Sequence, residues 1–284
     1  SGTVGLSGGN GSSGVVGSSL ATGSLGGTTA TEDFLATFVG TQYHDEDWTL
    51  TSRAERSSAD SGVRWSFTGG WYREQSAGHS LSMSLQHLDS TSRLAGPDEA
   101  RTELRFAWAW RPADSRWIIF NRTDLARERR DYAASVEETL RWVDNLHANW
   151  QPRADQQVGL QLGFRRVIGS FDELRLAGTT LLLAGDWRVD LPWRAFGRAL
   201  DTGLHAARIE SREAGVARSS FGFDVGISPA TNCWISVGYN VVGFHDADFS
   251  AARYTERGPY VAVRIKADQD TFKDLRLDSL RAPR

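Results

Sequence analysis

Two short fragments of this chain contain side chains that could catalyse hydrolysis. A serine hydrolase needs a nucleophilic hydroxyl, a histidine base and a third group that orients the histidine. The fragments His87-Leu88-Asp89-Ser90 and His147-Ala148-Asn149 bring such residue types together. Neither supplies a convincing nucleophile, base and orienting group, and isolated polar residues near a strand end are more often solvated. We therefore expect no catalytic residues and no enzyme activity, with a barrel phospholipase as the enzymatic alternative.

Metal binding is the other chemistry that the sequence could support. His205 and His245 lack the spacing of metal ligands, and Asp246 with Asp248 suggests at most a weak calcium loop, which we expect to be simply solvated. The lone Cys233 excludes an internal disulfide framework and is expected to pack on a strand. The sequence therefore predicts no metal site and no cofactor.

The elements that would position these side chains are strands, as residues 101–120 (RTELRFAWAWRPADSRWIIF) illustrate. Apolar Leu104, Phe106 and Trp108 alternate with charged or small residues, and a turn follows at 112–115. Successive side chains of a β-strand point to opposite faces, so this pattern predicts a strand with one apolar face and one polar face. A protein core and a lipid bilayer would both accept the apolar face.

The same two-residue period returns about twelve times between residues 46 and 272, which predicts an all-β chain. The turn at 112–115 is compact, whereas the connections near 89–100, 123–138 and 243–257 are longer and polar. The connections near 58–61, 168–173 and 212–216 are exceptions to this pattern, because they are short. Compact turns at one rim and longer loops at the other are typical of an antiparallel up-and-down barrel in an outer membrane.

Composition agrees with that interpretation without requiring it. The net charge of −3 indicates no nucleic-acid partner, and no apolar run is long enough for a transmembrane helix. The mean hydropathy of −0.39 is uninformative, because alternating strands average it away. The chain has 11 Trp against 1 Met, and tryptophan favours the membrane interface.

Strand length separates the membrane alternative from a soluble β-sandwich. A sandwich typically uses strands of about five or six residues, whereas several strands here reach about ten, enough to cross a bilayer when tilted. Within lipid every backbone amide and carbonyl must be paired, so a β protein spans it as a closed sheet. We therefore expect an antiparallel up-and-down transmembrane β-barrel of about 12 strands.

Three regions are expected along the chain. Residues 1–45 are predicted to be a flexible Gly/Ser-rich segment, because such a composition cannot bury enough apolar surface to fold alone. Within it, Phe34–Phe38 is a candidate short plug helix, and a disordered tail is the alternative. The barrel is expected to span 46–272, and residues 273–284 to form a C-terminal periplasmic tail.

Parity along each strand assigns side chains to the two faces of the expected barrel. The residues expected to face the lumen are Arg64, Tyr72, Glu103, Arg105, Arg111, Asp186, Arg188, Asp224, Arg264 and Lys266. The residues expected to face lipid or to form an interface girdle are Trp65, Trp71, Phe106, Trp108, Trp110, Trp150, Trp187, Phe223 and Val263. Charged pairs of both signs should fill a narrow lumen and leave little room for ion flow.

The final fifth of the chain resembles the last hairpin of the barrel domain that ends large Gram-negative surface proteins built from extracellular repeats, an autotransporter-like or porin-like barrel. The residues that carry the resemblance are Asn232–Phe244, Asp248-Phe249, Tyr254, Gly258-Pro259-Tyr260 and Lys266–Phe272, with weaker similarity over Leu182–Trp193. The resemblance implies an outer-membrane anchor or translocator at the end of a longer polypeptide and no catalytic motif. Such barrels commonly end in an aromatic residue, whereas here Phe272 is followed by KDLRLDSLRAPR.

The expected function is to anchor a surface-exposed partner or N-terminal region in a bacterial outer membrane, with translocation of that region as a further role. A small passive channel is the alternative, followed by a structural subunit of an envelope complex. Expected partners are outer-membrane lipid, lipopolysaccharide and an envelope or surface protein. The basic run Arg122–Arg130 is expected to be a solvated outer loop, with contact to lipopolysaccharide phosphates as the sharper alternative.

Overall fold

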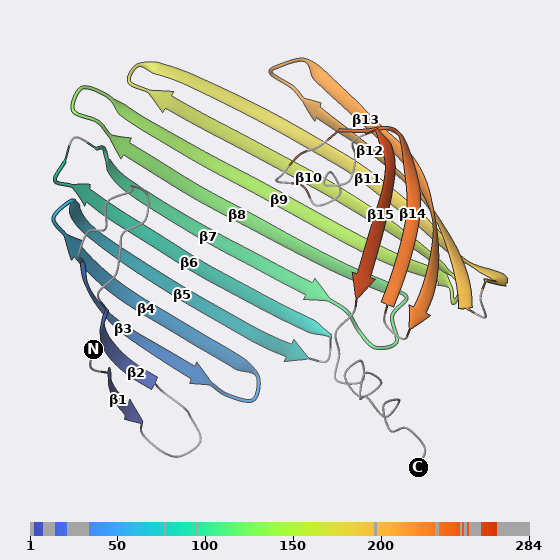
Figure 1. Cartoon of the computed structure of the whole chain (residues 1–284), viewed down its shortest axis with the longest axis horizontal. Helices are drawn as coiled ribbons and strands as arrows, with labels where there is room; N and C mark the ends of the chain where they lie inside the picture. The colour runs from blue at the N-terminus through green and yellow to red at the C-terminus, as the bar shows by residue number, and fades with distance from the viewer. Residues whose placement is uncertain are drawn as a thin grey trace, which may run out of the picture. The chain divides into compact units, whose positions relative to one another are not determined.

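The chain is all-β in the computed structural model, which describes residues 3–7, 15–21, 34–76, 78–94, 96–195, 198–230, 233–244, 246, 249 and 257–265. Its strands join in chain order into one antiparallel up-and-down sheet, in which each strand is hydrogen-bonded to the next (Figure 1). The strands are β1 Thr3–Ser7, β2 Val15–Ala21, β3 Phe34–His44, β4 Trp48–Ala59, β5 Gly62–Ser76, β6 His79–Ser92, β7 Asp98–Trp110, β8 Trp117–Asp131, β9 Val136–Arg153, β10 Gln156–Phe171, β11 Leu174–Ala195, β12 Arg198–Ser211, β13 Val216–Ala230, β14 Cys233–Val242 and β15 Gly258–Ile265.

The predicted antiparallel up-and-down architecture is confirmed. Twelve strands, β4 to β15, follow residue 45, and three more precede them. The sheet is not closed, because no pairing among the described residues joins β15 to the first strands. The described part of the chain contains no helix that is long and apolar enough to cross a membrane.

The chain divides into two compact units. The first comprises Ser1–His147, Gly163–Leu181 and Ser211–Gly215 and contains all of β1 to β8. The second comprises Ala148–Leu162, Leu182–Glu210 and Val216–Arg284 and contains all of β13 to β15.

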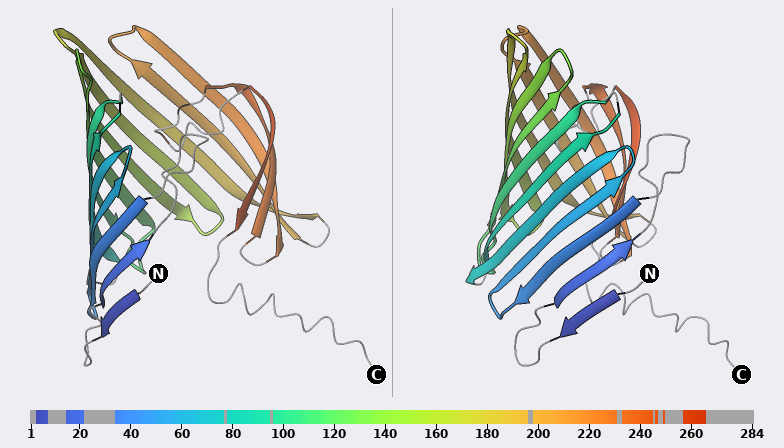
Figure 2. Two further views of the ribbon diagram at one scale, coloured as in Figure 1. Left: turned by 60° about the vertical axis from the view of Figure 1, so that its left-hand side comes forward. Right: turned by 90° about the vertical axis from the view of Figure 1, so that its left-hand side faces the viewer.

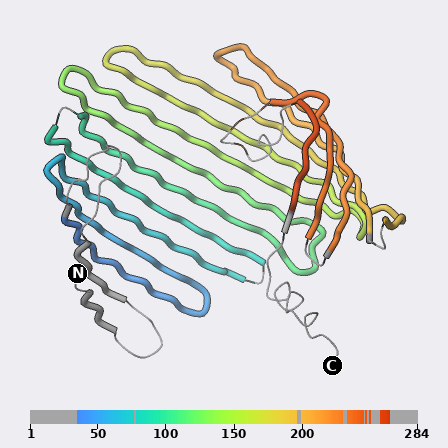
Figure 3. The backbone as a smooth tube through the Cα atoms, viewed as in Figure 1, coloured from blue at the N-terminus to red at the C-terminus, as the bar shows by residue number. Residues whose placement is uncertain are grey.

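In the first unit, β3 to β8 lie side by side in chain order and reverse direction at each turn (Figures 2 and 3). The pairing from β3 through β8 is regular except near Glu74 and Ser76. Residues opposite each other in an antiparallel pair share a face, so this register carries one face across six strands. We call the face with Glu103 and Arg105 the polar face, and the face with Phe106 and Trp108 the apolar face.

The sheet buries small and polar side chains and exposes many large apolar ones. Ser57, Glu103 and Asp124 are buried on the polar face of the first unit, whereas Trp65 and Phe106 on the apolar face are exposed. This arrangement is the reverse of a soluble sandwich, in which apolar faces cover each other.

The prediction of a short helix at Phe34–Phe38 is wrong. These residues open β3, which pairs with β4 from Phe34 opposite Ala59 to His44 opposite Thr49. Thr37, Val39 and Thr41 alternate along β3, and β-branched residues at alternate positions suit a strand better than a helix turn. With β1 and β2 also paired, the sheet begins before the predicted boundary at residue 46.

Two of the expected long loops are also wrong. The run Arg122–Arg130 lies within β8 and not in a loop, and the connection to β9 is only 132–135. Likewise β6 continues to Ser92 and β7 begins at Asp98. A charged sequence can remain a strand here because its charges pair with those of neighbouring strands. The expected turn at 112–115 is confirmed, with the Ser115 amide donating to the Pro112 carbonyl at 3.1 Å.

Candidate functional site

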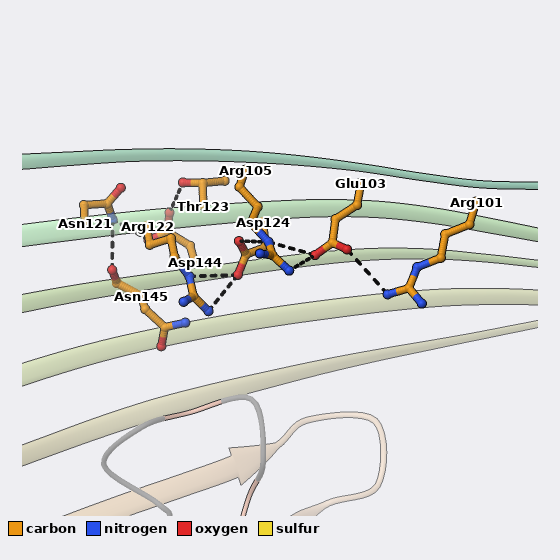
Figure 4. Close-up of polar contacts among 9 residues, drawn as sticks. All are labelled: Arg101, Glu103, Arg105, Asn121, Arg122, Thr123, Asp124, Asp144 and Asn145. Carbon is orange, nitrogen blue, oxygen red and sulfur yellow. Dashed lines mark hydrogen bonds and ion pairs between the residues drawn. The ribbon is translucent and has the colours of Figure 1, made fainter. Parts of the chain in front are cut away.

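Three arginines and two carboxylates form an alternating row on the polar face of the first unit (Figure 4). Glu103 on β7 accepts hydrogen bonds from Arg105 Nε at 2.9 Å and Nη2 at 2.7 Å, and its other oxygen lies 3.4 Å from Arg101 Nη2. On β8, Asp124 accepts from Arg122 Nε at 3.0 Å and lies 3.7 Å from Arg105 Nε. We call Arg101, Glu103, Arg105, Asp124 and Arg122 the arginine row.

The carboxylates of the arginine row are buried and its cations are not. The side chains of Glu103 and Asp124 are 7% and 10% exposed, whereas those of Arg101, Arg105 and Arg122 are 50%, 50% and 58% exposed. Asp124 Oδ1 is itself buried and has no hydrogen bond, only its ion-pair contact with Arg105. Solvent beside this row therefore meets guanidinium groups and not carboxylates.

Neutral hydroxyls cover much of the remaining polar face. The β6 residues opposite Arg105 and Ala107 are Ser84 and Ser82, and they connect through β5 to Gly70 and to the exposed, predicted site residue Tyr72.

Acidic residues return at the far end of β7 and β8, where Arg130 engages them. Its guanidinium lies 3.1 Å from Glu99, 2.5 Å from Glu128 and 3.7 Å from Glu137. Arg64 is the other predicted polar-face residue of β5. It lies at the same level of the sheet as Glu99, because it is opposite Ser90 of β6, which is opposite Glu99. Arg130 therefore offsets one of these three negative charges, and Glu128 also lies opposite Arg101 of the arginine row.

The apolar face of the first unit carries the predicted girdle residues. Trp65 and Phe106 are exposed, and Trp71, Trp108 and Trp110 are partly exposed on the same face. Trp71 pairs with Met83, which pairs with Phe106, so this apolar surface continues from strand to strand.

Sequence parity did not reveal a polar cluster on this apolar face. Asp144 of β9 accepts hydrogen bonds from Asn121 Nδ2 at 3.0 Å and from Thr123 Oγ1 at 2.5 Å (Figure 4). In the β7 and β8 register, Trp108 is opposite Asn121 and Phe106 is opposite Thr123. The carboxylate thus keeps both oxygens bonded within an aromatic surface.

In the second unit a single arginine lies between two buried carboxylates. Arg188 on β11 donates Nη1 to Asp201 of β12, and Nη2 to Asp224 of β13 at 2.8 Å. Tyr260 of β15 donates its hydroxyl to the other oxygen of Asp224 at 3.3 Å. The side chains of Arg188, Asp201 and Asp224 are only 21%, 8% and 7% exposed. We call these four residues the Arg188 centre.

Glycines make the space that this centre occupies. A Cβ on Gly226 would lie 2.7 Å from both carboxylate oxygens of Asp201. One on Gly203 would lie 2.9 Å from an oxygen of Asp224 and 3.0 Å from Arg188 Nη2. The side chains of the Arg188 centre therefore lie directly against the backbone of neighbouring strands.

A histidine and an asparagine pair beside the Arg188 centre. His205 Nε2 hydrogen-bonds with Asn240 Oδ1 at 2.8 Å, and its ring lies 6.0 Å from that of Tyr260. The pair resembles the base and orienting group of a hydrolase, but within the described residues no hydroxyl or thiol hydrogen-bonds to His205.

In the first hydrolase fragment the histidine and the serine do not meet. His87 bonds to Thr102 Oγ1 at 2.9 Å, on the face opposite to Ser90. In the part of the chain that the structure describes, no three His, Cys, Asp or Glu side chains gather as metal ligands. His245 and Asp248 lie outside the described residues.

The structure gathers some of the predicted polar residues and leaves others apart. Glu103 pairs with Arg105, and Asp224 pairs with Arg188. Asp186 is on β11, as is Arg188, and its carboxylate lies against Gly159 of β10. The remaining residues are placed as follows: Arg111 is exposed just after β7; Trp150, Trp187, Phe223 and Val263 are exposed on β9, β11, β13 and β15; Arg264 is on β15, with its side chain outside the described set; Lys266 lies outside the described residues.

One carboxylate in a turn has a pKa that is lowered by hydrogen bonds. Glu213, between β12 and β13, accepts hydrogen bonds from the backbone amide of Thr179 and from its Oγ1, the latter at 2.8 Å. These hydrogen bonds favour the ionised form and hold the pKa of Glu213 below its ordinary value.

The residues of the arginine row and the Arg188 centre that were absent from the predicted sets are Arg101, Arg122, Asp124, Asp201 and Tyr260, and Asn240 beside the centre was absent as well. Asp124 and Arg122 are two residues apart in β8, so their side chains share a face of the sheet. Interpreting this charged run as a loop hides that relation. Asp201, Asn240 and Tyr260 have no such local signal, because their partners are on other strands.

No protein-family model matches the chain, and no curated protein sequence matches it.

Proposed function

We propose that this chain is an outer-membrane β-barrel that anchors a surface-exposed partner or N-terminal region, with export of that region as a further role. The observation that carries the proposal is the continuous, exposed apolar surface across β3 to β8, set against a polar opposite face. An apolar surface of this extent needs a cover, and lipid covers one without any partner sheet.

Two further features support a membrane location. Strands β3 to β13 have 11 to 22 residues, whereas a tilted strand needs only about ten to cross the hydrocarbon. The similarity of residues 228–272 to the last hairpin of Gram-negative surface-protein barrels points to the same membrane. Since unpaired strand edges are costly in lipid, the proposal includes closure of the sheet in the bilayer.

Site-specific labelling in vesicles tests the membrane proposal. Single cysteines replace Phe106, Val263 or Tyr72 in a Cys233→Ser background, so that both faces are sampled. A lipid-soluble maleimide should label Phe106→Cys and Val263→Cys and spare Tyr72→Cys, whereas a water-soluble reagent should prefer Tyr72→Cys. Uniform labelling of all three by the water-soluble reagent would exclude lipid contact.

A narrow channel is the second candidate function, favoured by the hydroxyl-rich polar face of β5 and β6. Small neutral side chains such as Ser82 and Ser84 leave more room for water than paired charges do. Planar-bilayer recordings of the full chain separate the two functions. Small or rare openings support the anchor, and large steady conductance supports the channel.

A further inference from the structure

We propose that the arginine row of β7 and β8 binds a water-soluble phosphate-type oxyanion. Its charges alternate as cation, carboxylate, cation, carboxylate, cation, so both ends and the middle are guanidinium groups (Figure 4). The anion site itself concerns the polar face alone, whereas its restriction to water-soluble anions rests on the proposed contact of the apolar face with lipid.

The arginine row carries three positive and two negative charges, and because only the negative charges are buried it presents a cationic surface to solvent. Glu103 and Asp124 lie at most 10% exposed beneath arginines that are at least 50% exposed. The carboxylates hold the guanidinium groups in place, while the solvent side presents only positive charge. An anion that approaches Arg105 or Arg122 is therefore attracted by the guanidinium groups and does not contact the buried carboxylates of the row.

Each arginine of the row also keeps hydrogen-bond donors for a ligand. Arg105 and Arg122 use Nε and Nη2 for their carboxylates, and Arg101 uses only Nη2. Within the described residues the Nη1 groups of these three arginines have no partner. Guanidinium N–H groups match phosphate oxygens in geometry and form strong charge-assisted hydrogen bonds with them.

Two neighbours of the row add hydrogen-bonding side chains, and one neighbour adds a carboxylate. Ser84 and Gln86 of β6 lie opposite Arg105 and Glu103 in the register. Glu128 lies opposite Arg101 at one end of the row, and Arg130 lies 2.5 Å from it and 3.1 Å from Glu99. At the other end, Arg122 lies opposite Ala107 of β7 and so meets no acid on that strand.

The position of the row also defines the class of ligand. It lies on the polar face, opposite the exposed aromatic residues, so a phosphate attached to a membrane lipid would approach the wrong side of the sheet. Free phosphate, pyrophosphate and soluble sugar phosphates share the chemistry that the row recognises.

Calorimetric titration of the folded full chain in detergent micelles with inorganic pyrophosphate tests this site. At low ionic strength, where screening is weak, the parent chain should bind pyrophosphate. Arg122→Gln should weaken binding roughly tenfold, about the worth of one charge-assisted hydrogen bond. Glu103→Gln, which removes a negative charge and keeps the side-chain shape, should tighten it, a direction that a purely structural role would not produce.

Arg53→Gln is the matched control. Arg53 lies on the same face, is 51% exposed and pairs with Glu55 at 2.6 Å, but it stands outside the row. Its replacement should change the affinity less than twofold. If Arg122→Gln does not fold, Arg122→Lys replaces it, since it keeps the charge, loses the planar fork and should still weaken binding.

Three results would overturn the site. They are absence of pyrophosphate binding by the folded parent chain, equal weakening by Arg53→Gln and Arg122→Gln, and looser binding by Glu103→Gln. Micelles doped with phosphatidate should not compete for the site, and effective competition would reject its restriction to soluble anions.

Discussion

The arginine row and the Arg188 centre use the same residue types in opposite ways. In the row, three half-exposed cations enclose two buried carboxylates. In the centre, one arginine that is only 21% exposed lies between two buried carboxylates, one of which also accepts a hydrogen bond from a tyrosine. The first arrangement carries a net positive charge facing solvent, and the second a net negative charge withdrawn from it.

Glycine positions account for the difference. Gly203 and Gly226 let the carboxylates of the centre lie against neighbouring backbones, so three strands share one compact ion-pair network. The row has Ser84 and Gln86 as its β6 neighbours, and its arginines extend past them toward solvent. The centre is therefore suited to holding strands together, whereas the row is suited to binding a solute.

Replacing the central cation should produce the largest effect. Arg188→Met leaves Asp201 and Asp224 buried without their counter-charge, so it should lower the free energy of unfolding by about 3–5 kcal/mol. Arg101→Met in the exposed row should cost only about 0–1 kcal/mol, because its partner Glu103 keeps both hydrogen bonds from Arg105. Urea unfolding in micelles, followed by tryptophan fluorescence, measures both, and equal losses would break the contrast between the two regions.

Filling a glycine position of the centre should have an intermediate effect. Gly226→Ala brings a methyl group against both oxygens of Asp201, so the ion pair must shift, at a cost of about 1–3 kcal/mol. Gly178→Ala is the control, because no atom lies within 4 Å of a Cβ built there. The same unfolding assay should show the control unchanged or slightly stabilised, and an equal loss in both variants would reject the packing explanation.

The smallest effect is expected at Glu213, an exposed carboxylate of the first unit. Its pKa in the folded state lies below the ordinary value of 4.5, so its contribution to stability is present at neutral pH. That contribution is lost as the pH falls through the folded-state pKa. Glu213→Gln should therefore flatten the acid limb of a stability–pH curve.

Glu55→Gln serves as the control for the Glu213 measurement. Glu55 is also partly exposed, but its partner is the Arg53 side chain and not a backbone amide. A curve for Glu213→Gln that overlays the parent curve would show that the Thr179 hydrogen bonds contribute nothing.

Alternation made much of the architecture predictable. The apolar face of β7 is predicted by the alternation of Leu104, Phe106 and Trp108, and the register continues that face into the neighbouring strands. The strand β3 was not predicted, because the Gly/Ser-rich sequence that precedes it resembles a linker. The prediction for β8 ends too early because a run of charges is typical of a solvated loop, whereas in the sheet a polar face accommodates these charges.

The candidate sites were only partly predictable. Glu103 and Arg105 lie two residues apart on one strand, so a shared parity already places them together. Arg188, Asp201 and Asp224 come from three strands, and their meeting depends on register and on glycines that no local pattern identifies. The bonding of Asp144 within an aromatic surface likewise depends on β8 and β9 lying in one particular register.

The local alternation of residues is enough to specify the all-β class and the separation of apolar from polar side chains in strands such as β7, because alternation is a local property of an extended chain. Which carboxylates each arginine meets, and which charges stay exposed, is set by the folded arrangement of the strands. Those outcomes depend on strand pairing between residues far apart in the chain and on the space beside each side chain. The same alternation of arginine and acid therefore yields an open cationic row in one unit and a closed ion-pair centre in the other.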